Sequence, residues 1–270
     1  MTIAMIAKKI DATILKQIYK PASHSHKGQN GRLLIIAGSK KYHGSLVLAA
    51  TMASKIVDFV YVHTTKDNFA IIKNLRNNLA EFIYINKYDL KNVLKNEADA
   101  ILIGPGLIPN FKTKRLVHKI LKKYPNTKTL LDAGALRVVN KKLLHKNCVI
   151  TPHVEEFKHL FNITPNLKNL EKVSQEIPCT IILKGKIDYI CQNGICFENI
   201  TGNVGMTKGG TGDVLAGLLV ALLTKNDIST ATQIATYVCG LAGDKLQEKV
   251  GIYYSANELV GEIQKILSNK

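Results

Sequence analysis

The chain lacks the long apolar run that a membrane-spanning helix needs. No stretch of its 270 residues approaches about eighteen uninterrupted apolar side chains, and the first ten residues include Lys8 and Lys9 with no long apolar region behind them. Polar low-complexity tracts are lacking too, and 46% of the residues are hydrophobic, which is enough for one sizeable core. These features predict a cytoplasmic protein without a membrane partner.

Cysteine is scarce, and its number is odd. The five cysteines are spread over expected strands and one helix, at Cys148, Cys179, Cys191, Cys196 and Cys239. None belongs to a Cys-x-x-Cys pair, and no histidines stand beside them at the spacing of metal ligands. We therefore expect small core residues in a reducing compartment.

Arginine is rare although the chain is strongly basic. It has 37 basic and 20 acidic residues, a net charge of +17, but only four of the basic residues are arginines, at Arg32, Arg76, Arg115 and Arg137. Lysine lacks the planar fork with which arginine reads bases and phosphates. The lysines are also scattered over helical faces, with no aromatic interleaving. The charge thus favours solvated faces that attract anionic small molecules over a nucleic-acid surface.

Short, often β-branched apolar runs recur along the chain and predict buried strands. They lie at Leu33 to Ala37, Phe59 to Thr64, Phe82 to Ile85, Ala100 to Ile103, Thr129 to Asp132, Cys148 to Thr151 and Thr180 to Leu183. Segments with helical periodicity separate most of them, namely Ser45 to Val57, Asn68 to Leu79, Lys112 to Tyr124 and Leu167 to Ile177. This alternation predicts an α/β fold with a mostly parallel sheet covered by helices on both faces.

The rhythm changes after Gly185. Two short runs, Tyr189 to Cys191 and Ile195 to Phe197, flank Gln192-Asn193-Gly194, and Asn-Gly favours the turn of a hairpin. The remainder is expected to be helical, over Thr211 to Thr224, Ser229 to Lys249 and Ser255 to Leu267. Because no linker and no repeat interrupts the pattern, we expect residues 1–270 to form a single domain.

A late glycine-rich loop gives the strongest chemical signal. Five glycines lie between Gly202 and Asp213, and a long apolar helix follows directly. Glycines let the backbone approach an anion, and the amides at a helix N-terminus point at it, so phosphate is the natural guest. Asp213 stands where a carboxylate could take a proton from a substrate hydroxyl. The alternative is that Asp213 only caps the helix and the glycines only turn the chain.

The loop is neither a Walker motif, since Gly-Lys-Ser/Thr is absent, nor the dinucleotide fingerprint, which would follow an early strand. Its pattern, Gly-Asn-x-Gly-Met-x-x-Gly-Gly-Thr-Gly-Asp, resembles the signature of the ADP/ATP-dependent NAD(P)H-hydrate dehydratases of the ribokinase-like superfamily. Four further segments resemble motifs of that family in the same order: Lys27 to Ser45, Ala100 to Leu107, Val149 to Phe157 and Ile181 to Gly185. Each ligand loop follows an expected strand, which places the motifs at one edge of the sheet.

The resemblance implies a ribokinase-like three-layer fold and a set of site residues. By this likeness Asp213 is the catalytic acid/base, and the hydrated nicotinamide nucleotide is bound by Ser45, Gly104, Gly106, His153 and Asp213. The adenine nucleotide is bound by Lys184, Gly185, Lys186, Ile187, Asp188, Asn203, Gly209, Gly210, Thr211 and Gly212. Glu156 helps organise Mg²⁺ through water. His153 as a strand-end cap, Glu156 as a surface helix residue and Lys184 as a solvated side chain are the plainer alternatives.

The implied reaction repairs damaged NADH or NADPH. ADP or ATP phosphorylates the hydroxyl of the hydrate, and loss of the phosphate restores the nicotinamide double bond. The resemblance also implies a homo-oligomer, with a tetramer as one candidate size, and a dehydratase domain without the epimerase domain that often precedes it. The phosphate loop fits phosphoryl transfer, which demands positioning and charge stabilisation.

Three departures from the family pattern concern the substrate side. Val154 and Glu155 replace the usual Pro-Gly after the histidine, Gly134 replaces a second carboxylate, and Ser45 stands where alanine is usual. Two other functions remain open on this evidence. One is a ribokinase-like kinase of a small alcohol, of the thiazole or pyrimidine type, whose product keeps the phosphate. The other is a non-catalytic nucleotide-binding protein. A nucleic-acid-binding role rests on the charge alone and ranks last.

Overall fold

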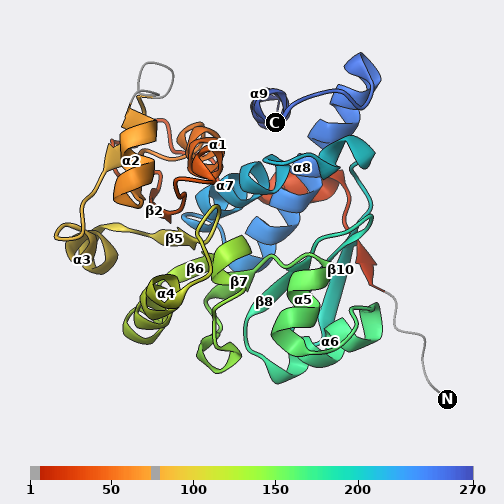
Figure 1. The fold of residues 1–270 in the computed structure, drawn as a ribbon. Helices are drawn as coiled ribbons and strands as arrows, with labels where there is room; N and C mark the ends of the chain where they lie inside the picture. Colours follow the sequence, from red (N-terminus) through yellow and green to blue (C-terminus); the bar gives the residue numbers. More distant parts are fainter. Residues whose placement is uncertain (1–6, 74–79, 270) are drawn as a thin grey trace.

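The computed structural model describes residues 7–73 and 80–269, which form one ten-stranded sheet between layers of helices (Figure 1). The strands lie in the order β1-β10-β9-β8-β7-β6-β5-β2-β3-β4. Their bounds are β1 Lys8–Lys9, β2 Arg32–Ile36, β3 Phe59–His63, β4 Ile83–Tyr84, β5 Ala100–Ile103, β6 Lys128–Leu131, β7 Cys148–Ile150, β8 Thr180–Leu183, β9 Asp188–Gln192 and β10 Ile195–Asn199. From β4 to β8 every pair is parallel, whereas β9 runs antiparallel to both β8 and β10.

The central strands are buried on both faces, and this explains their continuous apolar sequences. Leu33 and Ile35 of β2 pack in one core cluster, and Leu34 and Ile36 pack in the other, because successive side chains of a strand point to opposite faces. The first cluster also contains the apolar residues of α1, α7, α8 and α9, and the second contains those of α4, α5 and α6. Figure 1 shows these two groups of helices on opposite sides of the sheet.

The longer helices are α1 His43–Ser54, α4 Phe111–Lys123, α5 Val154–Phe161, α6 Leu167–Glu176, α7 Thr211–Leu223, α8 Ile228–Val250 and α9 Ala256–Ser268. Shorter helical segments are η1 Ala12–Gln17, α2 Lys66–Ile72, α3 Leu90–Asn92, η3 Val93–Glu97, η4 Ala133–Ala135, η5 Lys141–Leu143 and η6 Val204–Thr207. Among the described residues, no helix is both long enough and apolar enough to cross a membrane.

Helices α1 and α7 approach each other at backbone distance. A Cβ atom on Gly217 would overlap the carbonyl oxygen of Ala49, so only glycine fits there. Ser45 and Asp213 each lie four residues, about one turn, before this contact point. The close packing therefore brings the first turns of the two helices together at the sheet edge where the parallel strands end.

The structure confirms the expected α/β architecture and shifts the element boundaries by a few residues. The hairpin has its turn at Asn193 and Gly194, both with positive φ. The helix expected over Asn68 to Leu79 is seen as α2, and its residues 74–79 lie outside the described part. Helix α5 was not expected as an element, and His153, expected to end a strand, instead begins this helix.

The expectation for the cysteines is partly wrong. Cys148, Cys179 and Cys239 are buried free thiols, as expected of small core residues. Cys191 and Cys196, however, form a disulfide across the β9–β10 hairpin, with their Cα atoms 4.2 Å apart. The physical reason is the hairpin register, which pairs Cys196 with Cys191 directly.

Candidate active site

The candidate site lies at the carboxyl ends of the parallel strands, where the strand order changes direction. Strand β2 stands between β5 and β3, so the connections that leave β2 and β5 run to opposite sides and open a crevice between them. The loops after these two strands are joined by a hydrogen bond from the Gly38 amide to the Pro105 carbonyl oxygen, 2.8 Å long. This crevice is the place where open α/β sheets bind ligands.

Gly104 and Gly106 shape one wall of the crevice by close backbone packing. Both have positive φ, 130° and 67°. A side chain on Gly104 would overlap the Asp132 carbonyl oxygen, and one on Gly106 would lie 3.0 Å from the Ser45 Cβ. Gly134 packs in the same way, because its Cβ would overlap the Leu107 carbonyl oxygen. The backbone here has no room for the carboxylate that the family pattern places at this position.

The N-terminus of α7 presents open backbone to the crevice. Gly210 is its N-cap, with φ 101°, and has no side chain that could bond the first amides of the helix. Among the described residues, no neighbouring atom lies within 4 Å of a Cβ built on Gly209, and only the Lys184 Nζ does so for Gly212, at 4.0 Å. The Thr211 hydroxyl holds the turn by donating to the Met206 and Lys208 carbonyl oxygens at 2.6 and 2.9 Å. The loop is thus rigid in its backbone and open toward the anion position expected from the sequence.

Asp213 lies in the first turn of α7 and is half-buried. Burial raises its pKa to about 6, and the charge of Asp132 contributes to the rise, whereas a hydrogen bond from Ser45 and the charge of Lys184 oppose it. A carboxylate with this pKa is ionised at neutral pH and close to the value that suits a general base. Ser45, Asp213 and Lys184 come from α1, α7 and the end of β8, so the fold brings together residues that are far apart in the sequence.

A cavity of about 510 Å³ opens beside this turn. Its size lies within the range of small-ligand pockets. Seven of the ten predicted nucleotide-binding residues line it: Lys184, Gly185, Lys186, Asp188, Asn203, Thr211 and Gly212. Helix α8 closes it with Thr236, Cys239 and Gly240, which the sequence analysis did not identify. Ile187, Gly209 and Gly210 lie in the adjoining turns rather than among the lining residues.

Side-chain hydrogen bonds fix the rim of the cavity. The Asn203 Oδ1 accepts from the Gly205 amide at 2.9 Å and from the Tyr254 hydroxyl at 2.8 Å. Asp188 accepts from the Gly185 amide at 3.1 Å, and burial raises its pKa. Asn203 and Asp188 therefore organise the loops that form the pocket, whatever contact each makes with a ligand.

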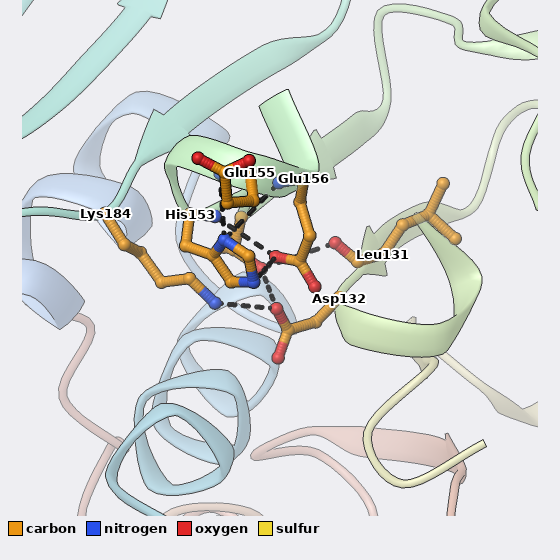
Figure 2. A network of polar contacts seen from close by, with 7 residues as sticks. Leu131, Asp132, His153, Glu155, Glu156 and Lys184 are labelled. Atoms are coloured by element: carbon orange, nitrogen blue, oxygen red, sulfur yellow. Dashed lines mark hydrogen bonds and ion pairs between the residues drawn. The ribbon is translucent and has the colours of Figure 1, made fainter. Parts of the chain in front are cut away.

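His153 and Glu156 together cap helix α5. The His153 Nδ1 accepts from the amides of Glu155 and Glu156 at 3.1 and 3.3 Å, and the Glu156 Oε2 accepts from the His153 amide at 3.1 Å. The imidazole Nε2 also lies 3.5 Å from the Glu156 Oε2. Figure 2 shows the two side chains against each other at the start of the helix. His153 is thus the N-cap of a helix rather than the strand-end cap of the plainer alternative, and Glu156 is buried rather than a surface residue.

Asp132 is a site residue that the sequence pattern marked only as the end of an expected strand. It follows β6 and is buried, and its Oδ1 accepts from the Lys184 Nζ and the Thr151 hydroxyl, both at 2.9 Å. Figure 2 shows the Lys184 and Asp132 side chains directed at each other, close to His153 and Glu156. The signal for Asp132 was a carboxylate directly after a buried strand, the same signal that marks many ligand-binding edges.

The residues present fit a loosely held magnesium ion better than a dedicated metal site. Within the described part of the chain, no three His, Cys, Asp or Glu side chains are grouped so that they could hold a metal ion. Mg²⁺ is usually held by one or two carboxylates together with substrate phosphates and water. Both contacts of Glu156 with His153 use its Oε2.

Comparison with known proteins agrees with this geometry. A model of the NAD(P)H-hydrate dehydratase family matches residues 33–265. The ADP-dependent (S)-NAD(P)H-hydrate dehydratase of Nitrosopumilus maritimus is 33% identical, with 97% of this chain and 98% of that protein covered. The bifunctional NAD(P)H-hydrate repair enzyme of Methanocaldococcus jannaschii is 36% identical over 94% of this chain, which spans about half of that longer protein.

Among solved structures, the ADP/ATP-dependent NAD(P)H-hydrate dehydratase of Bacillus subtilis, co-crystallised with ATP and Mg²⁺, is similar in fold. The TM-score is 0.81 at 24% identity, over 95% of both chains. This likeness confirms the ribokinase-like architecture expected from the sequence motifs. Because the family model covers most of the chain and a relative of the same length shares a third of its residues, this protein belongs to the NAD(P)H-hydrate dehydratase family.

Proposed function

We propose that this protein dehydrates the (S)-hydrates of NADH and NADPH at the expense of ADP or ATP. In the first step the hydrate hydroxyl oxygen attacks the terminal phosphorus of the nucleotide, and AMP or ADP leaves. In the second step the carbon–oxygen bond breaks, inorganic phosphate departs, a ring proton is lost, and the nicotinamide double bond is restored. Phosphorylation supplies the leaving group that a hydroxyl alone does not provide.

The adenine nucleotide occupies the cavity between the β8–β9 turn and helix α8. Its phosphates extend to the N-terminus of α7, where Gly209 and Gly212 leave the backbone open and the helix dipole favours negative charge. Lys184 provides a positive charge at the same place, since its Nζ lies 4.0 Å from the Cβ position of Gly212. The strongly basic surface, with a net charge of +17, attracts both anionic reactants.

The position of Asp213 carries the proposal. It lies between the nucleotide cavity and the crevice wall formed by Ser45 and Gly106, so its carboxylate can reach a hydroxyl that faces the phosphate loop. A pKa of about 6 leaves this carboxylate ionised at neutral pH and ready to accept the hydroxyl proton as phosphoryl transfer begins. The amides of the first turn of α7 stabilise the charge of the group that is transferred.

The hydrated nicotinamide lies in the crevice between the loops after β2, β5 and β7. Gly104 and Gly106 form the wall beside its ring by packing closely against the Asp132 and Ser45 segments, and His153 borders it from the start of α5. Glu156 helps to hold Mg²⁺ through water, and the ion, when bound with the nucleotide, neutralises phosphate charge. Val154 and Glu155 follow His153 at the start of α5, and both are exposed.

The direct test follows the return of the dihydronicotinamide absorbance when the protein is incubated with hydrated NADH or NADPH, Mg²⁺ and ADP or ATP. We expect recovery that requires a nucleotide. Phosphorylated hydrate that accumulates without elimination would instead indicate a small-molecule kinase. Nucleotide binding without turnover of either hydrate, by protein shown to be folded, would indicate a binding protein and would overturn the proposal.

The assembly state stays a prediction, a homo-oligomer for which a tetramer is one candidate size. Light scattering coupled to size-exclusion chromatography measures it directly, and a mass of one chain, about 29.8 kDa, would contradict it.

A further inference from the structure

A buried group of polar side chains behind the phosphate loop calls for a role in the reaction. Lys184 forms an ion pair with Asp132, whose carboxylate is 4% exposed, at 2.9 Å, and the same Oδ1 accepts the Thr151 hydroxyl at 2.9 Å. The Thr151 hydroxyl also lies 3.3 Å from the Leu131 carbonyl oxygen. These residues follow β8, β6 and β7, three neighbouring parallel strands, so their backbones are fixed by the sheet.

Backbone contacts fix the position of Lys184. Its amide donates to the Pro152 carbonyl oxygen at 2.9 Å, and its residue forms an isolated parallel bridge with His153. Burial alone would lower the pKa of Lys184, but the charge and hydrogen bond of Asp132, with the charges of Glu156 and Asp213, raise it above its ordinary value. The side chain therefore stays a cation, and its Nζ lies beside the phosphate loop, 4.0 Å from a Cβ built on Gly212.

We propose that Asp132 and Thr151 are positioning residues that hold the Lys184 ammonium against the phosphate loop, so that it meets the phosphoryl group during its transfer. Asp132 attracts the ammonium at one fixed oxygen. Thr151 orients that oxygen, because its hydroxyl is itself held between Asp132 and the backbone of β6. A preorganised cation lowers the energy of the transferring group without having to reorganise at the moment of reaction.

This inference rests on the proposed function, so its test starts from the wild-type recovery assay and adds a double-mutant cycle. Thr151→Val keeps the shape of the side chain and removes the hydroxyl, and we expect kcat to fall about tenfold while the KM for the nucleotide stays within about threefold. Thr151→Ser restores the hydroxyl and should restore kcat. In a Lys184→Met background, Thr151→Val should change kcat by less than about twofold, because the two residues act through one cation.

Asp132→Asn is the second arm, read out as a pH profile. The charged groups around Asp213 are Asp132 and Lys184, with Glu156 and His153 adjacent to Lys184. Loss of the Asp132 charge should lower kcat and move the acidic limb of the profile to lower pH. Glu262→Gln is the matched control. Glu262 on α9 is another buried carboxylate, and it forms an ion pair with Lys249 on α8. It should change neither quantity.

Calorimetry measures the affinity for ADP, and this test does not depend on the hydrate. Lys184→Met should weaken ADP binding about tenfold if the ammonium meets the phosphates. A wild-type protein that turns over neither hydrate would contradict the proposed function, and calorimetry alone would then decide the position of Lys184. Unchanged ADP affinity in Lys184→Met, or an equal loss of kcat from Thr151→Val with and without Lys184, would overturn the inference.

Discussion

Helices α5 and α7 both begin at the ligand-binding edge of the sheet, and both carry an acid three residues after the N-cap. In α5 the His153 imidazole accepts from two of the first amides, and Glu156 turns back to the amide of its own N-cap. In α7 the N-cap is Gly210, which has no side chain for this purpose. The first helix closes its own N-terminus, and the second leaves its N-terminus open.

The difference teaches what makes a helix N-terminus a binding site. An aspartate is one methylene shorter than a glutamate, and Asp213 interacts with Ser45, Lys184 and Asp132 from neighbouring elements. Glu156 can reach the N-cap amide of its own helix, and its side chain therefore stabilises the start of that helix. The open helix is the one beside the cavity, so the amides that lack a side-chain partner are those that a phosphate can reach.

The largest expected effect comes from removing the acid of the open helix. Asp213→Asn keeps the shape and removes the base, so kcat should fall by about 10² to 10⁴, measured by recovery of dihydronicotinamide absorbance. Nucleotide affinity, measured by calorimetry, should hold or rise, since a negative charge near the phosphates is lost. Asp67→Asn is the control, because Asp67 stands in the first turn of α2. Near-normal turnover in Asp213→Asn would make Asp213 a helix residue without a role as base.

The same substitution should stabilise the fold. The pKa of Asp213 is about 6 in the folded protein and lower in the unfolded chain, so ionisation of this residue lowers the free energy of unfolding as the pH rises from about 4 to about 6 and keeps it lowered at higher pH. Asp213→Asn should raise the free energy of unfolding at pH 7 by on the order of 1 kcal/mol, after allowance for solvent screening at a half-buried group. The gain should vanish below about pH 4, where the aspartate is protonated in both states. Denaturant titrations at the two pH values measure it.

The next largest effect tests the openness of α7 itself. A Cβ on Gly212 meets only the Lys184 Nζ, at 4.0 Å, so Gly212→Ala fits the unliganded fold. It should nevertheless weaken nucleotide binding about 10- to 100-fold, the equivalent of one lost hydrogen bond to a charged group, because the methyl group occupies the approach to the phosphates. Gly261→Ala in α9 also meets open space and should leave binding unchanged. Equal nucleotide affinity in both variants would place the phosphates elsewhere.

The open helix was predictable from sequence for local reasons. Consecutive glycines before an apolar helix specify both the turn and its exposure, and the acid that follows has its position fixed by the first helical turn. The strands were predictable for the same reason, since each is a continuous apolar run of the kind that a parallel sheet buries on both faces. Family resemblance then connected these local signals to one reaction.

The closed helix and its surroundings were harder to predict because they depend on pairing. His153 is an unusual N-cap residue, so the spacing from His153 to Glu156 did not indicate a capping box. The role of Asp132 depends on Lys184, 52 residues later in the chain. The Cys191–Cys196 disulfide could have been predicted from the sequence, because a two-residue turn at Asn193 and Gly194 sets the two cysteines opposite each other.

A smaller effect, about tenfold per pH unit, concerns the protonation of Asp213. Only the ionised carboxylate can accept a proton, so kcat/KM, which reports the free enzyme, should be constant above about pH 7 and should fall as the pH drops through the pKa of about 6. The pH profile of recovery from hydrated NADH measures this, with fresh hydrate at each pH because the compound is also changed by acid. The residual activity of Asp213→Asn should lack this limb. A limb that persists in the variant would assign it to another group.

The smallest effect separates the two possible roles of His153 in the closed helix. His153→Ala removes both the cap and the imidazole, whereas His153→Asn removes the imidazole and keeps a good N-cap residue. The alanine variant should lose about 1 kcal/mol of unfolding free energy, and the asparagine variant should lose little. If the imidazole borders the hydrated nicotinamide, both should raise the KM for the hydrate by about 3- to 10-fold with nucleotide affinity unchanged. A raised KM in the alanine variant alone would mean that His153 acts only by shaping α5. A loss of nucleotide binding with normal hydrate affinity would mean that the nucleotide and hydrate pockets have been assigned the wrong way round.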